Sequence, residues 1–396
     1  MEADKETYKE TEIKAIKNIQ NILQSGKPPF DYGNILLREY KNQIFSYFNE
    51  ENPIPYEIEI QPSSKCNANC SHCWAKNFSR LEDKFETKEN ADIIFNKILN
   101  FKDERLSSPK IKFCGSTGDP LMNPVIDYII DGFYGKRETR LFTNGIKIGQ
   151  EKDNLKYLVS LSKLNSIYLS IDSGTTETLW KIKSGAKKIG VSIEDIFQGA
   201  KKIKEINNTG IFASYVITKD NYNNIVEASK KSKENKFNLI RFRIDLLDRD
   251  LSREKSKEIL SSLNKAKEYE DETFKVIPIH SEKEISETNQ ECFSSKGRGL
   301  NCYTNIFWTC VGSNGRVYPC GHIVSPQTED YGSLFENTFQ EIWDGEKRKQ
   351  AILKVPGKLC NICSPFSLTT NEIMTELLLL PHDRILDVVN NNHYKR

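Results

Sequence analysis

The chain has 396 residues, of which 37% are hydrophobic, and its 57 basic and 55 acidic side chains leave a formal net charge of +2. This balance gives no electrostatic reason to expect a nucleic-acid or membrane partner. The amino terminus is charged and lacks the apolar stretch of a secretory signal, and no apolar run is long enough to span a membrane. We therefore expect a soluble, cytoplasmic protein with one large α/β domain and a smaller second one.

Residues 1–54 predict a helical extension. Apolar residues recur there at helical spacing, at Ile13, Ile16, Ile19 and Leu23. That run ends at Gly26, which precedes two prolines, and a second apolar stripe follows between Leu37 and Phe48. The pattern predicts a helical hairpin packed on the main domain; the alternative is a segment that grips a substrate.

Residues 55–285 predict repeated βα units. Amphipathic stretches alternate with strand candidates at 56–60, 110–114, 139–143, 166–171, 211–216, 239–244 and 274–278. Asn123 and Ser192 are the predicted N-caps of two of the intervening helices. Such a pattern indicates an α/β fold with a parallel sheet, open or curled toward a barrel. In folds of this kind the site lies at the carboxyl ends of the strands.

A second, small domain is predicted at 286–372, followed by a helical tail at 373–396. Gly, Cys and Asn become frequent there, and the sequence predicts a β-hairpin with Asn314 and Gly315 at its turn. A helix is expected around residues 338–352.

Three cysteines, Cys66, Cys70 and Cys73, lie in the loop after the first predicted strand. In a cytoplasmic protein, clustered cysteines indicate metal ligands or catalysts rather than disulfides. Structural zinc usually takes four ligands, and His72, the local candidate for a fourth, lies between Cys70 and Cys73, where it could not easily turn back to the same metal. A 4Fe–4S cluster held by three thiolates leaves one iron free for another ligand. A zinc site or three unrelated thiols is the alternative.

The spacing Cys-x3-Cys-x2-Cys directly after a first strand resembles the signature of the radical S-adenosylmethionine (SAM) superfamily. The resemblance implies that SAM chelates the free iron and that an electron from the cluster cleaves it to methionine and a 5'-deoxyadenosyl radical. This radical then abstracts a hydrogen atom from the substrate. The implied fold is a partial (β/α)6 TIM-like barrel. His72 stands where the family often has an aromatic residue packed near the adenine.

Segments after the next three strands also resemble family motifs. Residues 114–120, "CGSTGDP", resemble the Gly-Gly-Glu-Pro motif that holds the SAM ammonium, although a Thr replaces one Gly and an Asp the Glu. "FTNG" at 142–145 and "LSIDSG" at 169–174 look like the patterns that follow the third and fourth strands. The cofactor contacts that the resemblance implies are Thr117, Gly118, Asp119, Asn144, Ser170 and Asp172. For each short motif, a turn or cap role is the alternative.

A second cysteine group comprises Cys302, Cys320, Cys360 and Cys363. These four, with the segment around residue 340, resemble the SPASM and twitch domains of many radical SAM enzymes. No cysteine follows Cys363, which indicates the shorter twitch form with one auxiliary 4Fe–4S cluster. Four protein ligands favour electron transfer over substrate binding, and a structural zinc is the alternative.

Three further cysteines have less certain roles. Cys310 lies between two proposed ligands; it could replace Cys302 as a ligand, be a buried hydrophobe, or donate a hydrogen atom to a substrate radical. Cys114, at the end of the second strand, and Cys292 are further hydrogen-donor candidates.

The resemblance covers residues 55–365 and implies a radical SAM enzyme of oxidoreductase type with two 4Fe–4S clusters, SAM, and an electron donor such as flavodoxin or ferredoxin. The helical amino terminus does not look like a winged leader-binding module. We therefore expect oxidation, dehydrogenation or epimerisation of a small molecule such as a sugar or aminocyclitol. The alternatives are a maturase of a ribosomally made peptide and, in another class, a non-catalytic zinc-binding protein. Arg241, Arg243 and Asp245, at the end of a strand, are either SAM or substrate contacts or solvated, paired residues.

Overall fold

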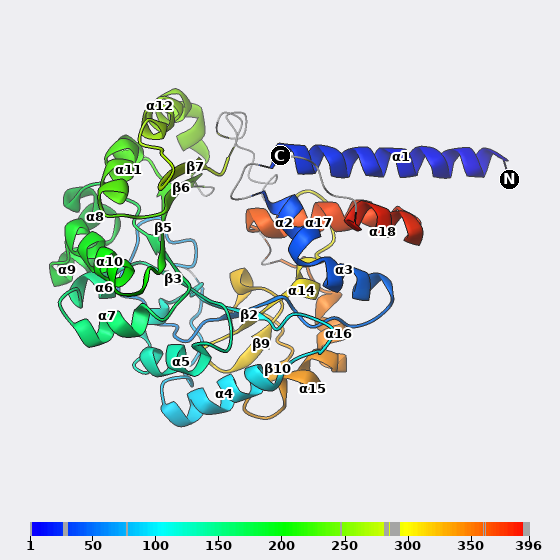
Figure 1. Cartoon of the computed structure of the whole chain (residues 1–396), viewed down its shortest axis with the longest axis horizontal. Helices are drawn as coiled ribbons and strands as arrows, with labels where there is room; N and C mark the ends of the chain where they lie inside the picture. Colours follow the sequence, from blue (N-terminus) through cyan, green and yellow to red (C-terminus); the bar gives the residue numbers. More distant parts are fainter. Residues whose placement is uncertain are drawn as a thin grey trace.

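The computed structural model describes residues 2–26, 31–76, 78–245, 248–280, 285, 294–358, 360 and 362–390. Its core is a parallel sheet in which the first seven strands are neighbours in chain order (Figure 1). These strands are β1 (Glu57–Ile60), β2 (Lys110–Phe113), β3 (Thr139–Thr143), β4 (Ser166–Ser170), β5 (Gly210–Ile217), β6 (Leu239–Ile244) and β7 (Lys275–Pro278). All seven predicted strands are confirmed. The sheet curves with β7 at one open edge, so the predicted partial barrel is confirmed, with a seventh strand beyond the six βα units.

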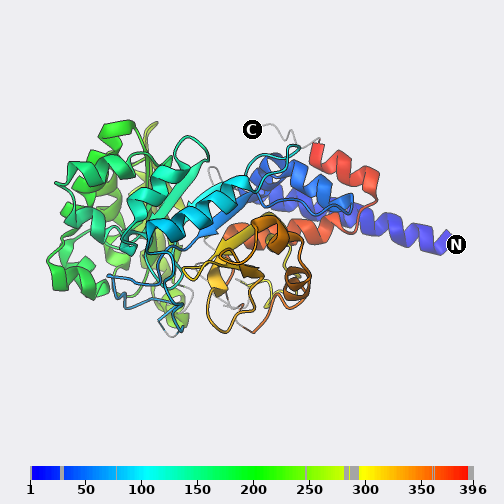
Figure 2. The ribbon, with the colours of Figure 1, turned by 90° about the horizontal axis from the view of Figure 1, so that it is seen from below.

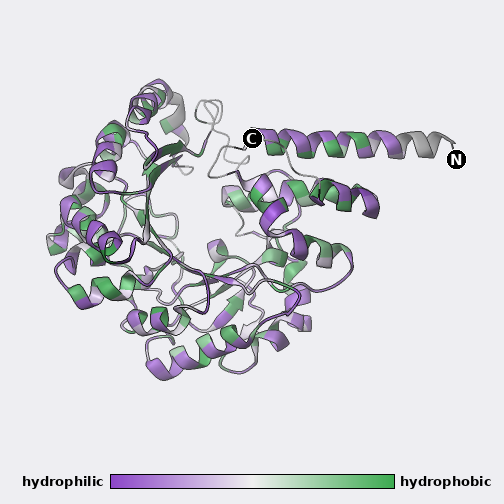
Figure 3. Ribbon diagram, viewed as in Figure 1, coloured by the Kyte–Doolittle hydropathy of each residue, from purple (hydrophilic) through white to green (hydrophobic). Residues whose placement is uncertain are grey.

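Helices cover the outer face of the curved sheet (Figures 1 and 3). They are α4 (Lys88–Asn100), α5 (Ile126–Phe133), α6 (Ile146–Gln150), α7 (Leu155–Leu161), α8 (Thr176–Ile182), α9 (Ser184–Ile189), α10 (Ile193–Asn207), α11 (Ile225–Glu234) and α12 (Arg249–Lys267), with the short 3-10 turns η1 (Pro120–Met122) and η2 (Tyr222–Asn224). On β5, Ile211, Ala213 and Tyr215 are fully buried under these helices. The alternate residues of the strand are less buried and face the inside of the barrel.

The two predicted helix starts had different outcomes. Ser192 caps α10 in a reciprocal capping box with Asp195, as predicted. The prediction for Asn123 was wrong, because α5 begins at Ile126 with Val125 as its N-cap. The Asn123 side chain instead joins three loop segments: its Nδ2 donates to the carbonyls of Pro62 and Phe85 (2.7 and 2.8 Å), and its Oδ1 accepts from the Val125 N–H.

The predicted hairpin is formed by β8 (Trp308–Val311) and β9 (Arg316–Tyr318), and Gly315 at its turn has a φ of +73°. β8 also pairs in parallel with β1, so the hairpin continues the sheet of the barrel, and β10 (Gly332–Ser333) ends it. The remaining elements of this region are α14 (Thr304–Phe307), η4 (Gly321–Ile323), α15 (Phe339–Asp344) and α16 (Glu346–Ile352). The single helix expected at 338–352 is thus two helices that meet at Gly345. The boundary at residue 286 stays a prediction.

The two ends of the described chain pack together (Figures 1 and 2). The helices α1 (Glu2–Ser25), α2 (Tyr32–Glu39) and α3 (Lys41–Phe48) share one apolar core with α17 (Pro365–Leu377) and α18 (His382–Asn390). Helix α17 runs across the predicted boundary at 372–373. Ile13, expected in the apolar stripe, is 59% exposed because the first half of α1 projects from this core. No described helix combines the length and apolarity that crossing a bilayer requires.

Candidate active site

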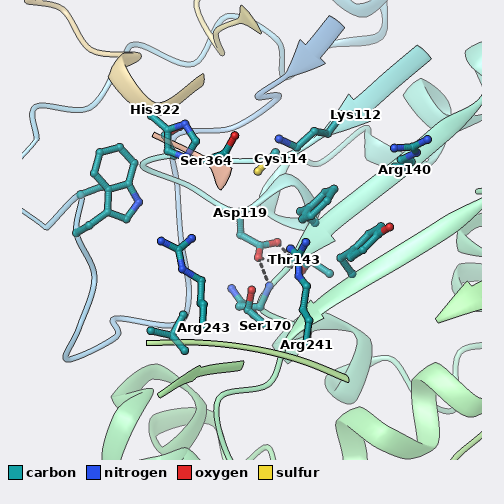
Figure 4. Close-up of a pocket in the computed structure, with 18 of the residues that line it drawn as sticks. Lys112, Cys114, Asp119, Arg140, Thr143, Ser170, Arg241, Arg243, His322 and Ser364 are labelled. Carbon is teal, nitrogen blue, oxygen red and sulfur yellow. Dashed lines mark hydrogen bonds between the residues drawn. The ribbon is translucent and has the colours of Figure 1, made fainter. Parts of the chain in front are cut away.

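A cavity of about 1160 Å³ opens at the carboxyl ends of the strands. Cys66, Cys70 and Cys73 line it from the loop after β1, and Cys114 lines it from the end of β2. Every predicted cofactor contact also lines it: His72, Thr117, Gly118, Asp119, Asn144, Ser170 and Asp172. His322 and Ser364, which closely follow Cys320 and Cys363 in sequence, also line it (Figure 4). The cavity is therefore lined by the first cysteine group and by residues close in sequence to the second.

The cysteine loop is fixed to the turn between α8 and α9. Cys70 forms an antiparallel β-bridge with Lys183. The Ser71 N–H donates to the Ile182 carbonyl and the Gly185 N–H to the Ala68 carbonyl, each at 2.9 Å. The loop is thus held in place by backbone bonds before any cofactor binds, as a preorganised ligand set requires.

Gly185 is the closest point of this contact, because a Cβ there would lie 1.8 Å from the Asn67 carbonyl oxygen. Gly185→Ala is expected to displace the loop, lower the free energy of unfolding by about 1–3 kcal/mol and reduce the iron retained. The matched control is Gly132→Ala, also in a helix, where the new Cβ meets Phe95 at an ordinary 3.4 Å. Thermal unfolding and iron counting compare the two variants; equal behaviour would contradict the tight contact.

The thiol of Cys66 lies among hydrogen-bond donors. The backbone N–H groups of Ala68 and Asn69 point at its sulfur, and Asn144 Nδ2 lies 3.8 Å away. Burial raises the pKa of Cys66, and it raises that of Cys70 to about 12. Metal binding must therefore displace protons from these thiols. Hydrogen bonds to sulfur are one of the factors that set the potential of an iron–sulfur cluster.

The second cysteine group shows the same donor pattern at each sulfur. Backbone N–H groups point at Cys302 from Thr304 and Asn305, and at Cys320, Cys360 and Cys363 from His322, Gly357 and Ser295. In the described part of the chain, no three His, Cys, Asp or Glu side chains converge as the ligands of one metal ion do. A cluster of four irons is larger and takes ligands from around its edges, so both cysteine groups fit it in donor type and surroundings.

Cys310 lies in a different environment. It is fully buried, it does not line the cavity, and its sulfur lies 3.9 Å from a carboxylate oxygen of Glu59. Burial, followed by Glu59, raises the pKa of this thiol well above its usual value. These surroundings favour the buried-hydrophobe interpretation, and they leave Cys114 as the hydrogen-donor candidate in contact with the cavity. Cys292 lies outside the described residues.

This contrast predicts which cysteine holds the auxiliary cluster. Cys302→Ala is expected to lower the iron content of the reconstituted protein from about eight to about four atoms per chain. Cys310→Ala, the matched control, is expected to keep about eight. Iron and sulfide counting with electron paramagnetic resonance checks both, and the reverse pattern would make Cys310 the ligand.

Asp119 uses its carboxylate within the protein (Figure 4). Its oxygens accept hydrogen bonds from the Thr143 hydroxyl (2.9 Å) and from the N–H groups of Asn144 (2.7 Å) and Leu121 (3.0 Å). Burial raises its pKa despite these donors. The bonds tie the loop after β2 to the loop after β3, and a contact with the SAM ammonium stays a prediction.

Asp172 and Lys183 form an ion pair below the cysteine loop. Their charged atoms lie 3.1 Å apart, the Lys183 side chain is 1% exposed, and Nζ also donates to the carbonyls of Ser170 and Ile171. Burial alone would raise the pKa of Asp172, but Lys183, His72 and the Val216 N–H together lower it. His72 Nε2 lies 4.0 Å from the same carboxylate.

The sequence analysis missed Lys183 and a second buried pair, Lys112 with Glu59, whose charged atoms lie 2.7 Å apart in the barrel. One signal was present: "EIEI" and "KIKF" place a charged residue at every second position of β1 and β2. Such alternation is typical of a strand with one face in solvent, whereas here that face lies inside the barrel.

The sequence profile of the Radical SAM superfamily matches residues 60–232, and that of the SPASM iron-sulfur cluster-binding domain matches residues 302–364. Among curated proteins, the chain is 27% identical over 161 residues to a probable GTP 3',8-cyclase of Methanocaldococcus jannaschii. That match covers 40% of this chain and 49% of the relative, so it spans about half the relative's length.

Solved structures show the same fold. Streptococcus suis SuiB bound to its precursor peptide SuiA aligns with a TM-score of 0.55 at 16% identity, over 82% of this chain and 74% of that one. SuiB bound to S-adenosylmethionine gives 0.54 at 15% identity, over 78% and 72% of the two chains. The structure of anSMEcpe with bound AdoMet gives 0.50 at 17% identity, over 85% and 100%. The chain contains a radical SAM domain and a C-terminal SPASM domain, and these two domains indicate 4Fe–4S clusters and SAM as its cofactors.

Proposed function

We propose that this enzyme abstracts a hydrogen atom from a small molecule bound in the cavity and oxidises or epimerises it. The observation that carries the proposal is that one cavity is lined by the first cysteine group and by residues close in sequence to the second. When bound, SAM and the first cluster supply a 5'-deoxyadenosyl radical. If the substrate loses a hydrogen atom and then one electron and one proton, it is dehydrogenated. If the substrate radical instead receives a hydrogen atom on its opposite face, it is epimerised.

In this proposal Cys66, Cys70 and Cys73 hold the SAM-binding cluster. Asn144 orients the Cys66 thiolate through its Nδ2 and is itself held, because its Oδ1 accepts from the Ile146 N–H at 2.8 Å. Gly118 lies so close to Ser63 that a Cβ would be 2.1 Å from the Ser63 carbonyl oxygen. The absence of a side chain at this position lets the loop after β2 pack directly against the backbone that follows β1.

The other four cysteines, Cys302, Cys320, Cys360 and Cys363, hold the auxiliary cluster. With four protein ligands this cluster has no free iron for the substrate, which favours a role in accepting the electron that the substrate loses. Cys114 is the candidate donor of a returning hydrogen atom. A flavodoxin or ferredoxin would supply the electron that SAM cleavage consumes.

A second candidate function is the maturation of a ribosomally made peptide. It is supported by the similarity in fold to SuiB, whose solved structure holds a precursor peptide. The described residues before β1 form the helices α1, α2 and α3.

The experiment is anaerobic reconstitution followed by a SAM cleavage assay with dithionite. We expect about eight irons per chain and formation of 5'-deoxyadenosine. A panel of sugars and aminocyclitols is then compared with short peptides encoded beside the gene. Acceleration by the small molecules supports the first function and acceleration by a peptide the second, whereas zinc in place of iron, or no SAM cleavage, would reject both.

A further inference from the structure

Seven Lys and Arg side chains line the cavity. Lys76 and Arg80 are exposed to solvent, and four of the other five have partners. Lys112 pairs with Glu59 (2.7 Å), Lys183 with Asp172 (3.1 Å) and Arg140 with Glu138 (2.7 Å), and Arg241 Nε donates to the Ser214 hydroxyl (2.6 Å). The fifth, Arg243, forms no ion pair or hydrogen bond with any residue that the structure describes.

Arg243 lies in surroundings that disfavour an unpaired charge. Burial and the neighbouring Arg241 lower the pKa of its guanidinium. The nearby acidic groups are Asp245, Tyr32 and Asp172, which act on it only from a distance. Asp172 is already committed to Lys183 and the Val216 N–H. A desolvated charge without a counterion costs free energy, so this residue reduces stability and keeps its full capacity to bind an anion.

Arg241 is the second guanidinium of the site. It lies two residues before Arg243 on β6, so the two side chains emerge on the same face of the strand and extend into the cavity together (Figure 4). Arg241 lies over the rings of Phe142 and Tyr168, with its guanidinium carbon 5.6 and 5.1 Å from their centroids. These rings are stacked 4.3 Å apart. The Arg241 guanidinium thus packs against two aromatic rings, whereas the Arg243 guanidinium is available to bind a ligand.

We propose that Arg243, with Arg241 beside it, binds an oxyanion of the substrate, either a carboxylate or a phosphate. A guanidinium presents paired N–H donors that match both groups. This inference rests on the proposed function and narrows its substrate class: the small molecule carries an acidic group, and Phe142 and Tyr168 offer an apolar surface to the part beside that group. A neutral sugar or aminocyclitol would leave Arg243 without a partner.

The test is calorimetric titration of the reconstituted, SAM-saturated protein with inorganic phosphate and, separately, succinate, at constant ionic strength. We expect both probes, or one of them, to bind the unaltered protein, and the stronger one identifies the oxyanion. Arg243→Gln is expected to weaken that binding at least about tenfold, as the loss of one charged hydrogen-bond partner does. Arg243→Lys, which keeps the charge, is expected to be intermediate. The control is Arg105→Gln, because Arg105 is an exposed arginine already paired with Asp103. The affinity of this variant for the anion probe is expected to stay unchanged.

Three results would overturn the proposal: no binding of either probe to the unaltered protein, equal binding by Arg243→Gln, or a loss of SAM affinity in that variant with anion affinity retained. Thermal unfolding shows that the variants are folded, and Arg243→Gln is expected to melt no lower than the unaltered protein, since a desolvated charge is removed. Formation of 5'-deoxyadenosine by the unaltered protein is measured separately. If it forms while anion binding fails, the inference alone is rejected and the proposed function stands.

Discussion

Replacing Cys66, Cys70 and Cys73 together by alanine is expected to abolish SAM cleavage and to lower the iron content from about eight to about four atoms per chain. All three side chains line the cavity, and the backbone bonds of their loop to the α8–α9 turn do not involve their sulfurs. The triple variant therefore removes ligands while it keeps the loop. 5'-Deoxyadenosine is measured by chromatography after reduction with dithionite, beside iron and sulfide counts.

The complementary variant changes the other four cysteines to alanine: Cys302, Cys320, Cys360 and Cys363. It is expected to keep about four irons, those of the first site, because none of these four cysteines lines the cavity that Cys66, Cys70 and Cys73 line. Together the two variants assign each half of the iron to its own cysteines. SAM cleavage that survives the triple change, or zinc bound in place of iron, would show that the loop after β1 does not hold the catalytic cluster.

The core of the fold was predictable because its signals are local. The helix-facing residues of each strand are apolar, and β-like runs alternate with amphipathic runs, so all seven parallel strands could be located. The pairing of β8 with β1 joins Thr309 to Ile58, about 250 residues apart in sequence. The spacing of apolar residues within one segment does not indicate which distant segment will pair with it. The packing of α1 and α2 against α17 was missed for the same reason, since both partners simply appear amphipathic.

The candidate site was predictable where a motif has fixed spacing. The three cysteines and the segments after β2, β3 and β4 all line the cavity as expected. The partners of the charged groups were not predictable. Asp119 was expected to face SAM, whereas its described partners are Thr143, Asn144 and Leu121. Lys183 stands in a lysine-rich stretch typical of a solvated helix, and only the fold shows that it is buried against Asp172.

Lys183→Met is expected to lower the free energy of unfolding by about 3–5 kcal/mol. Methionine is unbranched and apolar, so it can follow the path of the lysine stem. The variant leaves the buried Asp172 carboxylate without its counterion and the Ser170 and Ile171 carbonyls without their donor. Without Lys183, burial is expected to raise the pKa of Asp172, so a larger fraction of this carboxyl is protonated and uncharged as the pH falls. Since a neutral carboxyl needs no counterion, the substitution should lower the free energy of unfolding less at pH 5 than at pH 8.

The double variant with Asp172→Asn separates the ion pair from the rest of the contact. Asparagine tolerates the positive φ of +52° at this position and can still accept from the Val216 N–H. We expect it to recover about half of the loss, because no unpaired charge remains buried. The matched control is Lys202→Met, which breaks an exposed pair with Asp153 and is expected to cost less than about 1 kcal/mol. Denaturant titration under anaerobic conditions measures the unaltered reconstituted protein, the single variants Lys183→Met and Asp172→Asn, the double variant and the Lys202→Met control. If the two single losses simply add in the double variant, Lys183 and Asp172 do not stabilise the site as a pair.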